Sequence, residues 1–569
     1  MLRPAARASL LRRNVKRRVI TPKRSVSTAV PQESDVVIVG GGPAGLALAS
    51  ALSSDSLVRN ALRVVLVEAS DLAKVESWSP PAGTFSNRVS SITNASQSFL
   101  QEIGAWAHVE QGRTCPIWDG LSGARITFST HDDSAWALST SDAPSQMARL
   151  TENLNLQRAL LRHLTARPAV EVTDKVKVDS IQREDREGGG WPLVHLSDSR
   201  VLRARLLVGA DGFNSPVRAY AGIQSYGWAY DTTAIVATLF HHPRTPFQAP
   251  NTIAYQRFLP TGPIAFLPLS ATASSLVWST KPHLAKALLS SDPGVLTSMI
   301  NVAFRLPDVS IRYLHNIILE AASSGAPLTP HQLQQEIAWR ERSHGIDSRS
   351  AYSIAADATG VPPEDADSLP PLVTSIQPGS AASFPLRFNH ADEYIGDGAG
   401  ARTVLVGDAA HTVHPLAGQG LNMGLGDVEA LFRCIHKAVL TGADIGSRTA
   451  LLPYARERYF ENHKIMAACD KLHKLYSVTA EPVVWARSVG VEVLNELDSV
   501  KAAMMLTAGS RPSHARPSGT QFGANLAATG LESLARGISG VRTLSEAAAN
   551  MASAGVRRLL QSVTDSQRR

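Results

Sequence analysis

The stretch Asp35-Val-Val-Ile-Val-Gly-Gly-Gly-Pro-Ala-Gly45 decides how this 569-residue chain folds, because an apolar strand here runs directly into a glycine-rich turn. A helical pattern follows over about Ala44–Ser53, and a second apolar strand covers Arg63–Glu68. A strand, a tight turn, a helix and a second strand of these lengths predict a βαβ unit that opens an α/β domain.

The turn and the end of the second strand together predict a dinucleotide site. Gly40, Gly42 and Gly45 allow the tight turn, the close approach of a pyrophosphate, and close packing of the helix on the strand. The N–H groups at the start of that helix favour phosphate. Glu68 follows Gly45 by 23 residues, where an acid accepts hydrogen bonds from a ribose. These four residues are expected to bind an ADP moiety; a glycine-rich turn without a ligand is the alternative.

Two later segments repeat the pattern of a buried strand that ends near an acid. Leu206–Gly209 runs into Asp211, and Thr403–Gly407 runs into Asp408. We expect both strands to lie parallel to the first, with their carboxyl ends facing a ligand. On its own, an ordinary Asp-Gly turn would account for Asp211. The glycine-rich segment Pro415–Asn422 then opens a helix, whose N–H groups suit the negative charge of a reduced flavin.

The middle of the chain has a different sequence pattern. Short β-type runs joined by turns predict an antiparallel sheet inserted as a second domain. These runs are Thr233–Leu239, Thr252–Leu259, Ile264–Leu267 and Ser275–Trp278, with a turn at Pro260–Pro263. Residues 340–380 are polar and rich in Pro, Ser, Asp and Gly, so we expect a surface insertion there. Helices are expected over about Asp427–Leu440 and Tyr454–Tyr476.

Both ends of the chain are basic, whereas its body is mildly acidic. Residues 1–30 carry nine Lys or Arg and no acid, residues 511–569 carry eight Arg against three acids, and residues 31–510 carry 39 basic and 46 acidic residues. The acidic body argues against a nucleic-acid partner. The Arg-rich N-terminus is typical of a mitochondrial transit peptide, with a basic arm as the alternative. The tail 511–569 is expected to be weakly ordered, or else an amphipathic helix at a membrane surface or partner.

The chain offers little for metal or disulfide chemistry, and no apolar run is long enough to span a bilayer. We reject a metal site at His411 and His414, because no cluster of acids or cysteines completes a ligand shell. Cys115, Cys434 and Cys469 are widely separated and fit no zinc or disulfide spacing, so we expect reduced thiols in or near a core.

Taken in order, these segments resemble the FAD-dependent aromatic hydroxylases of the para-hydroxybenzoate hydroxylase fold, and within that fold the ubiquinone-biosynthesis hydroxylases. The resemblance covers about residues 35–505 and is carried by Asn87–Thr93, Glu152-Asn153, Gly209–Arg218, Gln256–Pro268, Phe384–Leu386 and Val404–Gly424. Asn301–Pro307 and the transit-like N-terminus resemble the mitochondrial, fungal-like branch, the ring C5-hydroxylases of coenzyme Q synthesis. The tail after residue 510 departs from the family pattern.

The resemblance implies an α/β fold in which a Rossmann-like FAD-binding domain is built from two separate parts. Residues 1–30 are the expected transit peptide, and residues 31–225 and 386–440 are the expected FAD-binding parts. An antiparallel-sheet substrate domain is expected at 226–385, C-terminal helices at 441–510, and the tail at 511–569.

The resemblance also implies roles for individual residues. Gly40, Gly42, Gly45 and Glu68 hold the ADP half of FAD. Arg88 reaches the flavin phosphates or sugar, unless it makes an ordinary surface ion pair. Asp211 belongs to the segment associated with the pyrophosphate and with nicotinamide contact, and Asp408 binds the ribitol or pyrophosphate. The isoalloxazine is faced by Gly418, Gln419, Gly420, Leu421 and Asn422, with Pro415 beside its reactive edge. No catalytic acid or base is assigned, because the flavin performs the chemistry.

The implied activity is that of an FAD-dependent aromatic-ring monooxygenase of ubiquinone biosynthesis. Reduced flavin would react with O2 at C4a as a hydroperoxide and pass one oxygen to ring carbon C5 of a polyprenyl-4-hydroxybenzoate. The segment Phe258–Leu267 could wall a channel for the polyprenyl tail, or could be ordinary core. No second complete glycine motif marks a nicotinamide domain, and the family favours ferredoxin with its reductase as the electron donor, with NADPH as the alternative. The implied location is peripheral, on the matrix side of the mitochondrial inner membrane, within a coenzyme Q biosynthetic complex.

Three other functions are compatible with the same motifs. A soluble NADPH-dependent hydroxylase would act on another small phenol or aniline. A flavin reductase of the same fold would bind FAD without incorporating oxygen. A non-catalytic scaffold in a biosynthetic assembly would function without FAD.

Overall fold

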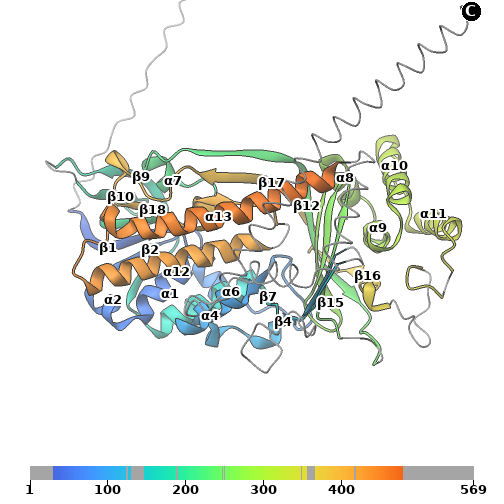
Figure 1. Ribbon diagram of the computed structural model, residues 1–569, viewed down its shortest axis with the longest axis horizontal. Coiled ribbons are helices and arrows are strands. Elements are labelled where there is room, and N and C mark those ends of the chain that lie inside the picture. Colours follow the sequence, from blue (N-terminus) through green and yellow to red (C-terminus); the bar gives the residue numbers. More distant parts are fainter. Residues whose placement is uncertain are drawn as a thin grey trace, which may run out of the picture.

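A seven-stranded sheet forms one end of the molecule, with β1 (Gln32–Val39) inside it (Figure 1). The computed structural model describes residues 30–122, 126–129, 146–186, 190–246, 248, 250–347, 349–354, 366–415 and 418–478. β1 pairs in parallel with β2 (Val64–Val67) on one side and β11 (Val201–Gly209) on the other. β18 (Thr403–Leu405) pairs in parallel with β11. The prediction that the three apolar strands lie parallel and close together is confirmed.

The same sheet continues with β8 (Val170–Thr173) beyond β2, and with antiparallel β10 (Pro192–Leu196) and β9 (Val178–Arg183) beyond β11. Val36, Val37 and Ile38 of β1 are fully buried, as expected for a central strand covered on both faces. α1 (Pro43–Ser54) follows β1 and contacts α6 (Asn153–Ala166) and α12 (Gln419–Leu440). The predicted βαβ unit is therefore present.

Short elements complete this half of the molecule. The helices are α2 (Ser56–Ala61), α3 (Leu72–Glu76), α4 (Asn94–Glu102) and α7 (Pro216–Tyr220). A small antiparallel sheet has the order β3-β7-β4, formed by β3 (Val89–Thr93), β7 (Ala148–Glu152) and β4 (Thr114–Ile117). β3 matters for the site, because it follows the segment that carries Arg88.

A second, nine-stranded sheet forms the other half, in the order β19-β17-β12-β15-β14-β13-β5-β6, with β16 also on β12. The predicted antiparallel strands are all in it; three are longer than expected, and β13 begins one residue later than expected. Their bounds are β12 (Ser225–His241), β13 (Ile253–Leu259), β14 (Gly262–Pro268) and β15 (Ala273–Thr280). The other members are β5 (Asp119–Ser122), β6 (Ile126–Ser129), β16 (Val373–Ile376), β17 (Ala382–Ala391) and β19 (His411–Thr412).

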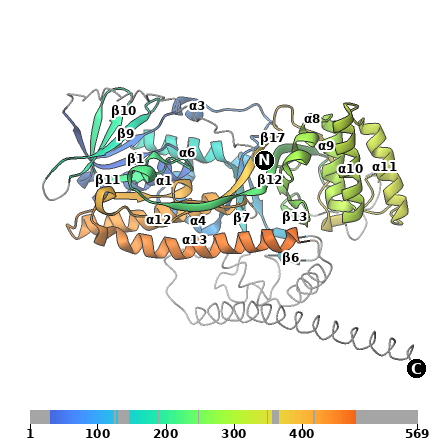
Figure 2. The same cartoon turned by 90° about the horizontal axis from the view of Figure 1, so that it is seen from above.

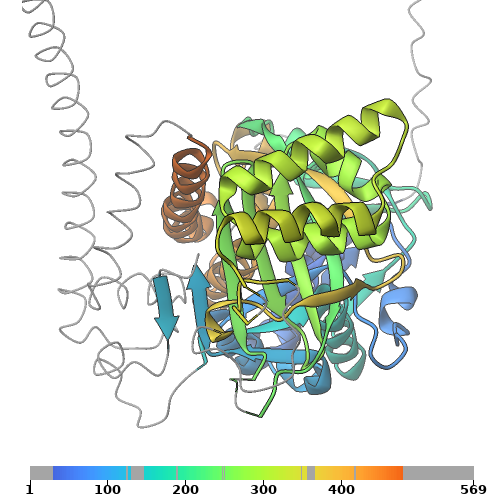
Figure 3. The same ribbon diagram turned by 90° about the vertical axis from the view of Figure 1, so that its right-hand side faces the viewer.

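Four helices that the sequence analysis did not predict cover one face of this sheet (Figure 3). They are α8 (Pro282–Ser290), α9 (Pro293–Arg305), α10 (Asp308–Ser324) and α11 (Pro330–Ser343). Ile264, Phe266 and Trp278 are buried in one hydrophobic core with these helices. Buried residues alternate along β13 and β14. One face of this sheet therefore packs against the helices, and the other is directed toward the first half of the molecule.

The expectation of a surface insertion at 340–380 is wrong for part of that range. β16 pairs antiparallel with β12, and Leu369 and Val373 are buried. Asn301 fixes Val373 through two hydrogen bonds of 2.9 Å, one to its N–H and one to its carbonyl oxygen. A short edge strand needs only a few buried side chains, so a polar composition did not reveal it. Residues 355–365 of the range lie outside the described residues.

The C-terminal part is helical as predicted, but each helix begins earlier than expected. α12 packs against α13 (Arg448–Ser477), which also contacts β13 and β14 and so extends from one sheet to the other (Figure 2). Residues 479–510 and the tail 511–569 lie outside the described residues, as does the expected transit peptide apart from Val30. Within the described ranges, no helix combines the length and the apolar character needed to cross a membrane.

Two long strands join the halves of the molecule. β12 and β17 pair from Ser225 with Ala391 to Val236 with Ala382 (Figure 1). The expected domain boundaries after residues 225 and 385 fall inside these strands, which continue through both positions. The division into domains therefore stays a prediction. β12 and β17 run from one half of the molecule into the other.

Candidate functional site

The carboxyl ends of four parallel strands lie side by side at one edge of the first sheet. Gly40 N–H donates to the Val67 carbonyl at 2.8 Å, and Ala210 N–H donates to the Val39 carbonyl at 2.8 Å. Val406 N–H donates to the Gly209 carbonyl at 2.9 Å. The three segments singled out in the sequence therefore leave the sheet next to one another.

The glycine-rich turn is crowded at Gly45 and open at Gly42. At Gly45 an added Cβ would lie 1.9 Å from the Gly40 carbonyl oxygen, so only glycine fits where α1 begins against the turn. At Gly42, which caps α1, an added Cβ would meet nothing within 4 Å, and no side chain caps the helix. The start of α1 thus has no side-chain cap and has open space beside Gly42, both of which an anion site requires.

Glu68 reaches over this turn from the end of β2. One carboxylate oxygen accepts the Gly41 N–H, and the other accepts the N–H (2.7 Å) and hydroxyl (2.6 Å) of Ser70. The side chain also lies where a Cβ on Gly41 would be, with its Cγ 2.9 Å away. The structure therefore brings Glu68 and the turn together in the arrangement that the sequence spacing predicts.

The second segment is tied to the third by an arginine. Arg218 donates to the Ala409 carbonyl at 2.7 Å and to the Phe213 carbonyl at 2.5 Å. Asp211 accepts the Val217 N–H through Oδ2 at 3.1 Å, which is the local role that an ordinary turn would give it. Its Oδ1 is buried without a partner, and burial raises the pKa of this carboxyl group. Asp211 thus makes one structural bond and keeps one buried oxygen without a partner among the described residues, and its expected contact with the cofactor stays a prediction.

Asp408 follows β18, in the short turn Gly407–Ala409. Its side chain is exposed to solvent, yet the surrounding protein desolvates it enough to raise its pKa, against the opposing effect of His411. No partner for its carboxylate is found within the described ranges. A carboxylate that is reachable by water but crowded by protein is well placed to accept hydrogen bonds from a ligand hydroxyl.

We expect Asp408→Asn to weaken FAD binding without weakening the apoprotein. The variant loses a charged acceptor toward the ligand, a loss of roughly 1 to 2 kcal/mol, or about 5- to 30-fold in affinity. Removing a crowded, unpartnered charge should leave the melting temperature of the apoprotein unchanged or slightly higher. Flavin titration and thermal melts of the apoprotein measure the two effects, and a lower melting temperature with unchanged affinity would contradict the assignment.

Arg88 lies between the two halves of the molecule, just before β3. Its side chain is exposed, and no carboxylate of the described residues pairs with it, so the alternative of a surface ion pair finds no support there. Its backbone is fixed, because the Asn153 N–H donates to the Arg88 carbonyl at 3.0 Å. Glu152 accepts the Ser86 N–H and two hydrogen bonds from Arg113, at 2.6 and 2.9 Å. The segment is therefore rigidly held while the guanidinium remains free.

The start of α12 approaches this segment. Gly418 caps the helix in the left-handed conformation with φ of 61°, and no side chain satisfies the N–H groups of the first turn. Gln419, Gly420 and Leu421 of this turn are half-buried, and Pro415 before it is also half-buried. Residues 416 and 417 lie outside the described residues. A second uncapped helix start is thus present, as the sequence predicts for an anionic flavin edge.

Asn422 is directed toward β3. Its Oδ1 accepts the Thr93 N–H at 3.0 Å, and its Nδ2 donates to the Ser91 carbonyl at 2.7 Å. The side chain is buried and bound by protein at both ends. Asn422 therefore fixes the start of α12 against β3, and its expected contact with the isoalloxazine stays a prediction.

The sequence analysis missed Asp427 as a site residue. This carboxylate is fully buried in α12, and it accepts hydrogen bonds from His411 (2.6 Å), the Gly407 N–H (3.0 Å) and Arg458 (2.9 Å). Burial by itself would raise its pKa, but His411, Arg458 and Asn462 hold the pKa at about 2. Asp427 thus fixes the turn that carries Asp408. Its position on the apolar face of α12, between Leu425 and Val428, was the available signal.

The histidines of this region have roles other than joint metal binding. His411 is paired with Asp427, whereas His414 packs against the rings of Tyr230 and His473 at 5.3 and 4.8 Å. In the part of the chain that the structure describes, no group of three or more His, Cys, Asp or Glu side chains could hold a metal ion. The three cysteines are free thiols, with Cys115 and Cys469 buried and Cys434 half-buried.

The face of the second sheet opposite the helices also carries apolar side chains, and part of it is covered, because Ala254 and Leu267 pack against buried side chains of β4 and β7. Ala254, Phe258, Ala265, Leu267 and Val277 occupy positions that alternate with the residues buried against the helices, and all five are half-buried. Phe258 stacks on Tyr476 of α13 at 4.1 Å. Within Phe258–Leu267, Leu259, Ile264 and Phe266 are core, and the expected channel wall stays a prediction for the half-buried apolar residues.

Several polar groups of this region lack protein partners, and together they fit FAD. The start of α1 is uncapped, Asp211 keeps a buried free oxygen, and Asp408 and Arg88 have no ion pair among the described residues. Cationic and N–H groups suit phosphates, and carboxylate oxygens suit ribose and ribitol hydroxyls. An extended dinucleotide can satisfy all of them at once.

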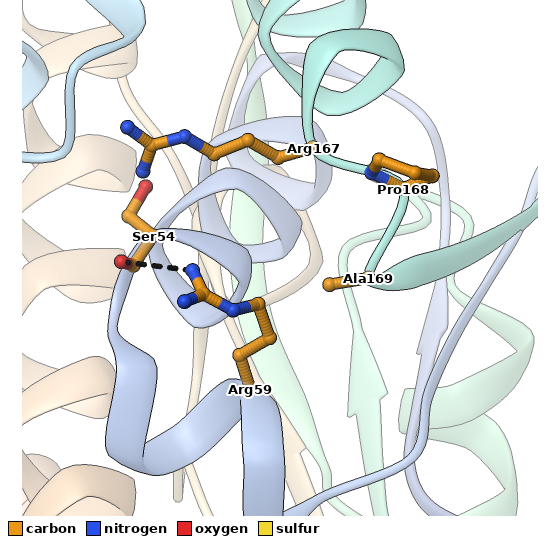
Figure 4. Close-up of a pocket in the computed structure, with 5 residues that line it drawn as sticks. All are labelled: Ser54, Arg59, Arg167, Pro168 and Ala169. Atoms are coloured by element: carbon orange, nitrogen blue, oxygen red, sulfur yellow. Dashed lines mark hydrogen bonds between the residues drawn. The ribbon is translucent and has the colours of Figure 1, made fainter.

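A separate hollow of about 570 Å³ lies near the end of α1 (Figure 4). Ser54, Arg59, Arg167, Pro168 and Ala169 line it, and Arg59 donates to the Ser53 carbonyl at 2.9 Å. None of the residues predicted to bind FAD lines this hollow.

Comparison with known proteins gives consistent results. The FAD-binding-domain family matches residues 33–293 and 295–468. The mitochondrial ubiquinone biosynthesis monooxygenase COQ6 of Schizosaccharomyces pombe is 36% identical over 502 residues, covering 86% of this chain and 94% of the relative. The COQ6 proteins of Saccharomyces cerevisiae (37% identical, 89% and 98% covered) and Homo sapiens (35% identical, 83% and 91% covered) are also similar.

Solved structures are similar in fold. The p-nitrophenol 4-monooxygenase of Pseudomonas putida matches 85% of this chain and its own full length with a TM-score of 0.55 at 16% identity. A probable FAD-dependent monooxygenase of Pseudomonas aeruginosa matches 78% of this chain and 97% of its own with a TM-score of 0.52 at 21% identity.

Proposed function

The chain belongs to the family of FAD-binding ubiquinone biosynthesis monooxygenases, and from this premise we propose that it hydroxylates ring carbon C5 of a polyprenylated 4-hydroxybenzoate derivative. The observation that carries the proposal is the meeting of the two uncapped helix starts, α1 and α12, with unpartnered Asp408 and Arg88. This meeting place is joined by β12 and β17 to a sheet with a half-buried apolar face.

The residues divide the binding of FAD among them. The start of α1 and Arg88 would hold the diphosphate, Glu68 the adenosine ribose, and Asp408 the ribitol or pyrophosphate. When bound, the flavin supplies the activation of dioxygen. The start of α12 would stabilise negative charge at the flavin ring, while Asp427 and Asn422 keep that helix start and the Asp408 turn in place.

The substrate would lie between the flavin site and the uncovered part of the sheet face opposite the helices. Its phenol ring must reach the flavin edge near Pro415, and its apolar tail needs a surface that excludes water. Phe258, Ala265 and Val277 provide apolar, half-buried surface, which supports this placement.

Electron donor, assembly and location are also part of the proposal. We infer reduction by ferredoxin and its reductase, and membership of a coenzyme Q biosynthetic complex on the matrix side of the inner membrane. The relatives are named mitochondrial, and the Arg-rich, acid-free N-terminus supports import. The polyprenyl substrate supports peripheral contact with a membrane.

The decisive test supplies purified full-length protein with a short-tailed prenyl 4-hydroxybenzoate under ¹⁸O₂. One reaction contains NADPH alone, and the other contains ferredoxin, its reductase and NADPH. We expect one ¹⁸O atom at ring C5, formed in the ferredoxin reaction. Labelled product in the reaction that contains NADPH without ferredoxin would show that ferredoxin is not required as the donor. Flavin turnover without labelled product would favour a reductase.

Two further comparisons separate the remaining alternatives. Small phenols and anilines without a prenyl tail should be poor substrates, and fast turnover of them with NADPH would indicate a soluble hydroxylase of another substrate. If cells carrying a variant that cannot bind FAD still made ubiquinone at the normal rate, the protein would be a scaffold.

A further inference from the structure

The turn Gln377–Ser380, between β16 and β17, lies against the segment that carries Arg88. The Gln377 side chain accepts the Phe85 N–H and donates to the Phe85 carbonyl, both at 2.9 Å. This pair of bonds joins residues 292 positions apart in the sequence. It reproduces with a side chain the two-bond pattern of an antiparallel strand pair.

The turn itself is anchored on β12. Gln377 N–H donates to the Thr238 carbonyl at 2.9 Å, and the Ser380 hydroxyl accepts the Thr238 N–H at 3.1 Å. Ser380 also donates to the Gln377 carbonyl at 2.7 Å. Ser380 and Thr238 are buried, so these bonds are shielded from water. The turn therefore moves with the second sheet.

Residues 84–88 are held from the opposite side by the first half of the molecule. Arg113 donates to the Thr84 carbonyl at 2.8 Å and lies over the Phe85 ring at 5.0 Å. Buried Glu152 accepts the Ser86 N–H. On the sheet side, Asn87 donates to the Ser380 carbonyl at 2.5 Å. The segment before Arg88 is thus held on one side by the first half of the molecule and on the other by the second sheet.

We propose that Gln377 is a positioning residue for FAD, which acts by fixing the Arg88 segment relative to the second sheet. This inference rests on the proposed function, in that Arg88 is taken to contact the cofactor. Its physical basis is that a free guanidinium binds a phosphate well only if its backbone is already held in place, since ordering it on binding would reduce the affinity. The same clamp would make the position of Arg88 depend on the sheet that faces the substrate.

The test compares Gln377→Ala with Gln332→Ala. Gln332 is a matched control, because its side chain also accepts a backbone N–H (Thr329, 3.0 Å) and belongs to a helix cap in α11. FAD affinity is measured by quenching of flavin fluorescence on titration with apoprotein, and stability by thermal melts of the same apoproteins. We expect Gln377→Ala to weaken FAD binding about tenfold, equal to about 1.4 kcal/mol, and Gln332→Ala to change it less than twofold.

A double-mutant cycle with Arg88→Ala separates positioning from general destabilisation. If Gln377 acts through Arg88, adding Gln377→Ala to Arg88→Ala costs no further FAD affinity. The inference is overturned if the two losses are additive, if Gln377→Ala lowers only the melting temperature, or if Arg88→Ala leaves the affinity unchanged. These readouts need no turnover, so a failure of the hydroxylation assay with an intact cycle would count against the proposed substrate alone.

Discussion

Replacing Gly42 with valine is expected to abolish FAD binding while leaving the apoprotein folded. The backbone of Gly42 has φ of −72° and ψ of 178°, an extended conformation that any residue adopts, and its Cβ would enter open space. That open space lies above the uncapped start of α1, so the valine methyls would occupy the place of the diphosphate. We expect affinity to fall by roughly two orders of magnitude or more, because the closest backbone approach is lost.

Substitutions at two other glycines serve as controls for this prediction. Gly112→Val also places its side chain in open space, at an exposed position, and should retain flavin. Gly45→Ala should instead destabilise the fold by roughly 1 to 3 kcal/mol, because its Cβ would overlap the Gly40 carbonyl oxygen. The visible absorbance of purified protein reports bound flavin, and circular dichroism reports folding. A flavin-loaded Gly42→Val protein would show that the diphosphate lies elsewhere.

Replacing Asp427 with leucine is expected to cause the largest loss of stability, roughly 3 to 5 kcal/mol, because it leaves buried partners without their counter-charge. His411 and Arg458 both pair with Asp427, and the Gly407 N–H would also lose its acceptor. Urea unfolding of the apoprotein measures the change. Glu429→Ala on the same helix is the control, since Glu429 pairs with Arg433 near the surface and should contribute less than about 1 kcal/mol. Equal losses in the two variants would contradict the role assigned to Asp427.

Asp427 also predicts a pH dependence. Its pKa is lowered from 3.8 to about 2 in the folded protein, so the folded state binds fewer protons than the unfolded state between these values. The stabilisation is complete above about pH 4 and is lost as the pH falls toward 2, and it amounts to roughly 2 kcal/mol. The stability difference between the wild type and Asp427→Asn should therefore shrink between pH 5 and pH 3. A difference that is constant over this range would exclude the assignment.

The sequence predicts the parts of this molecule whose requirements are local. The turn Gly40–Gly45 is recognisable because each glycine answers a steric demand of its immediate neighbours, and Glu68 follows at a fixed spacing. β12 to β15 are recognisable because apolar runs alternate with turns. The helices α8 to α11 were missed although Val295, Met299 and Ile300 repeat at helical spacing on a buried face. That helical spacing was the available signal for these helices.

Other features depend on contacts that no local pattern encodes. Gln377 and Phe85 are 292 residues apart, and neither belongs to a motif. Asn422 lies within a predicted motif, but no local pattern predicts its hydrogen bonds to Thr93 and Ser91 of β3. Asp427 gave a readable signal, a carboxylate among buried apolar positions of a helix, but its partners His411 and Arg458 come from other elements.

The continuity of β12 and β17 has a consequence for anyone who wishes to divide this protein. A fragment cut after residues 225 and 385 would divide β17 and leave Tyr226–Ala229 of β12 as a strand edge without partners. Such an edge invites pairing with other chains, so the excised sheet should aggregate when expressed alone. The two halves therefore act as one structural unit. We expect chimeras of this protein with its relatives to fold only when β12 and β17 are exchanged together.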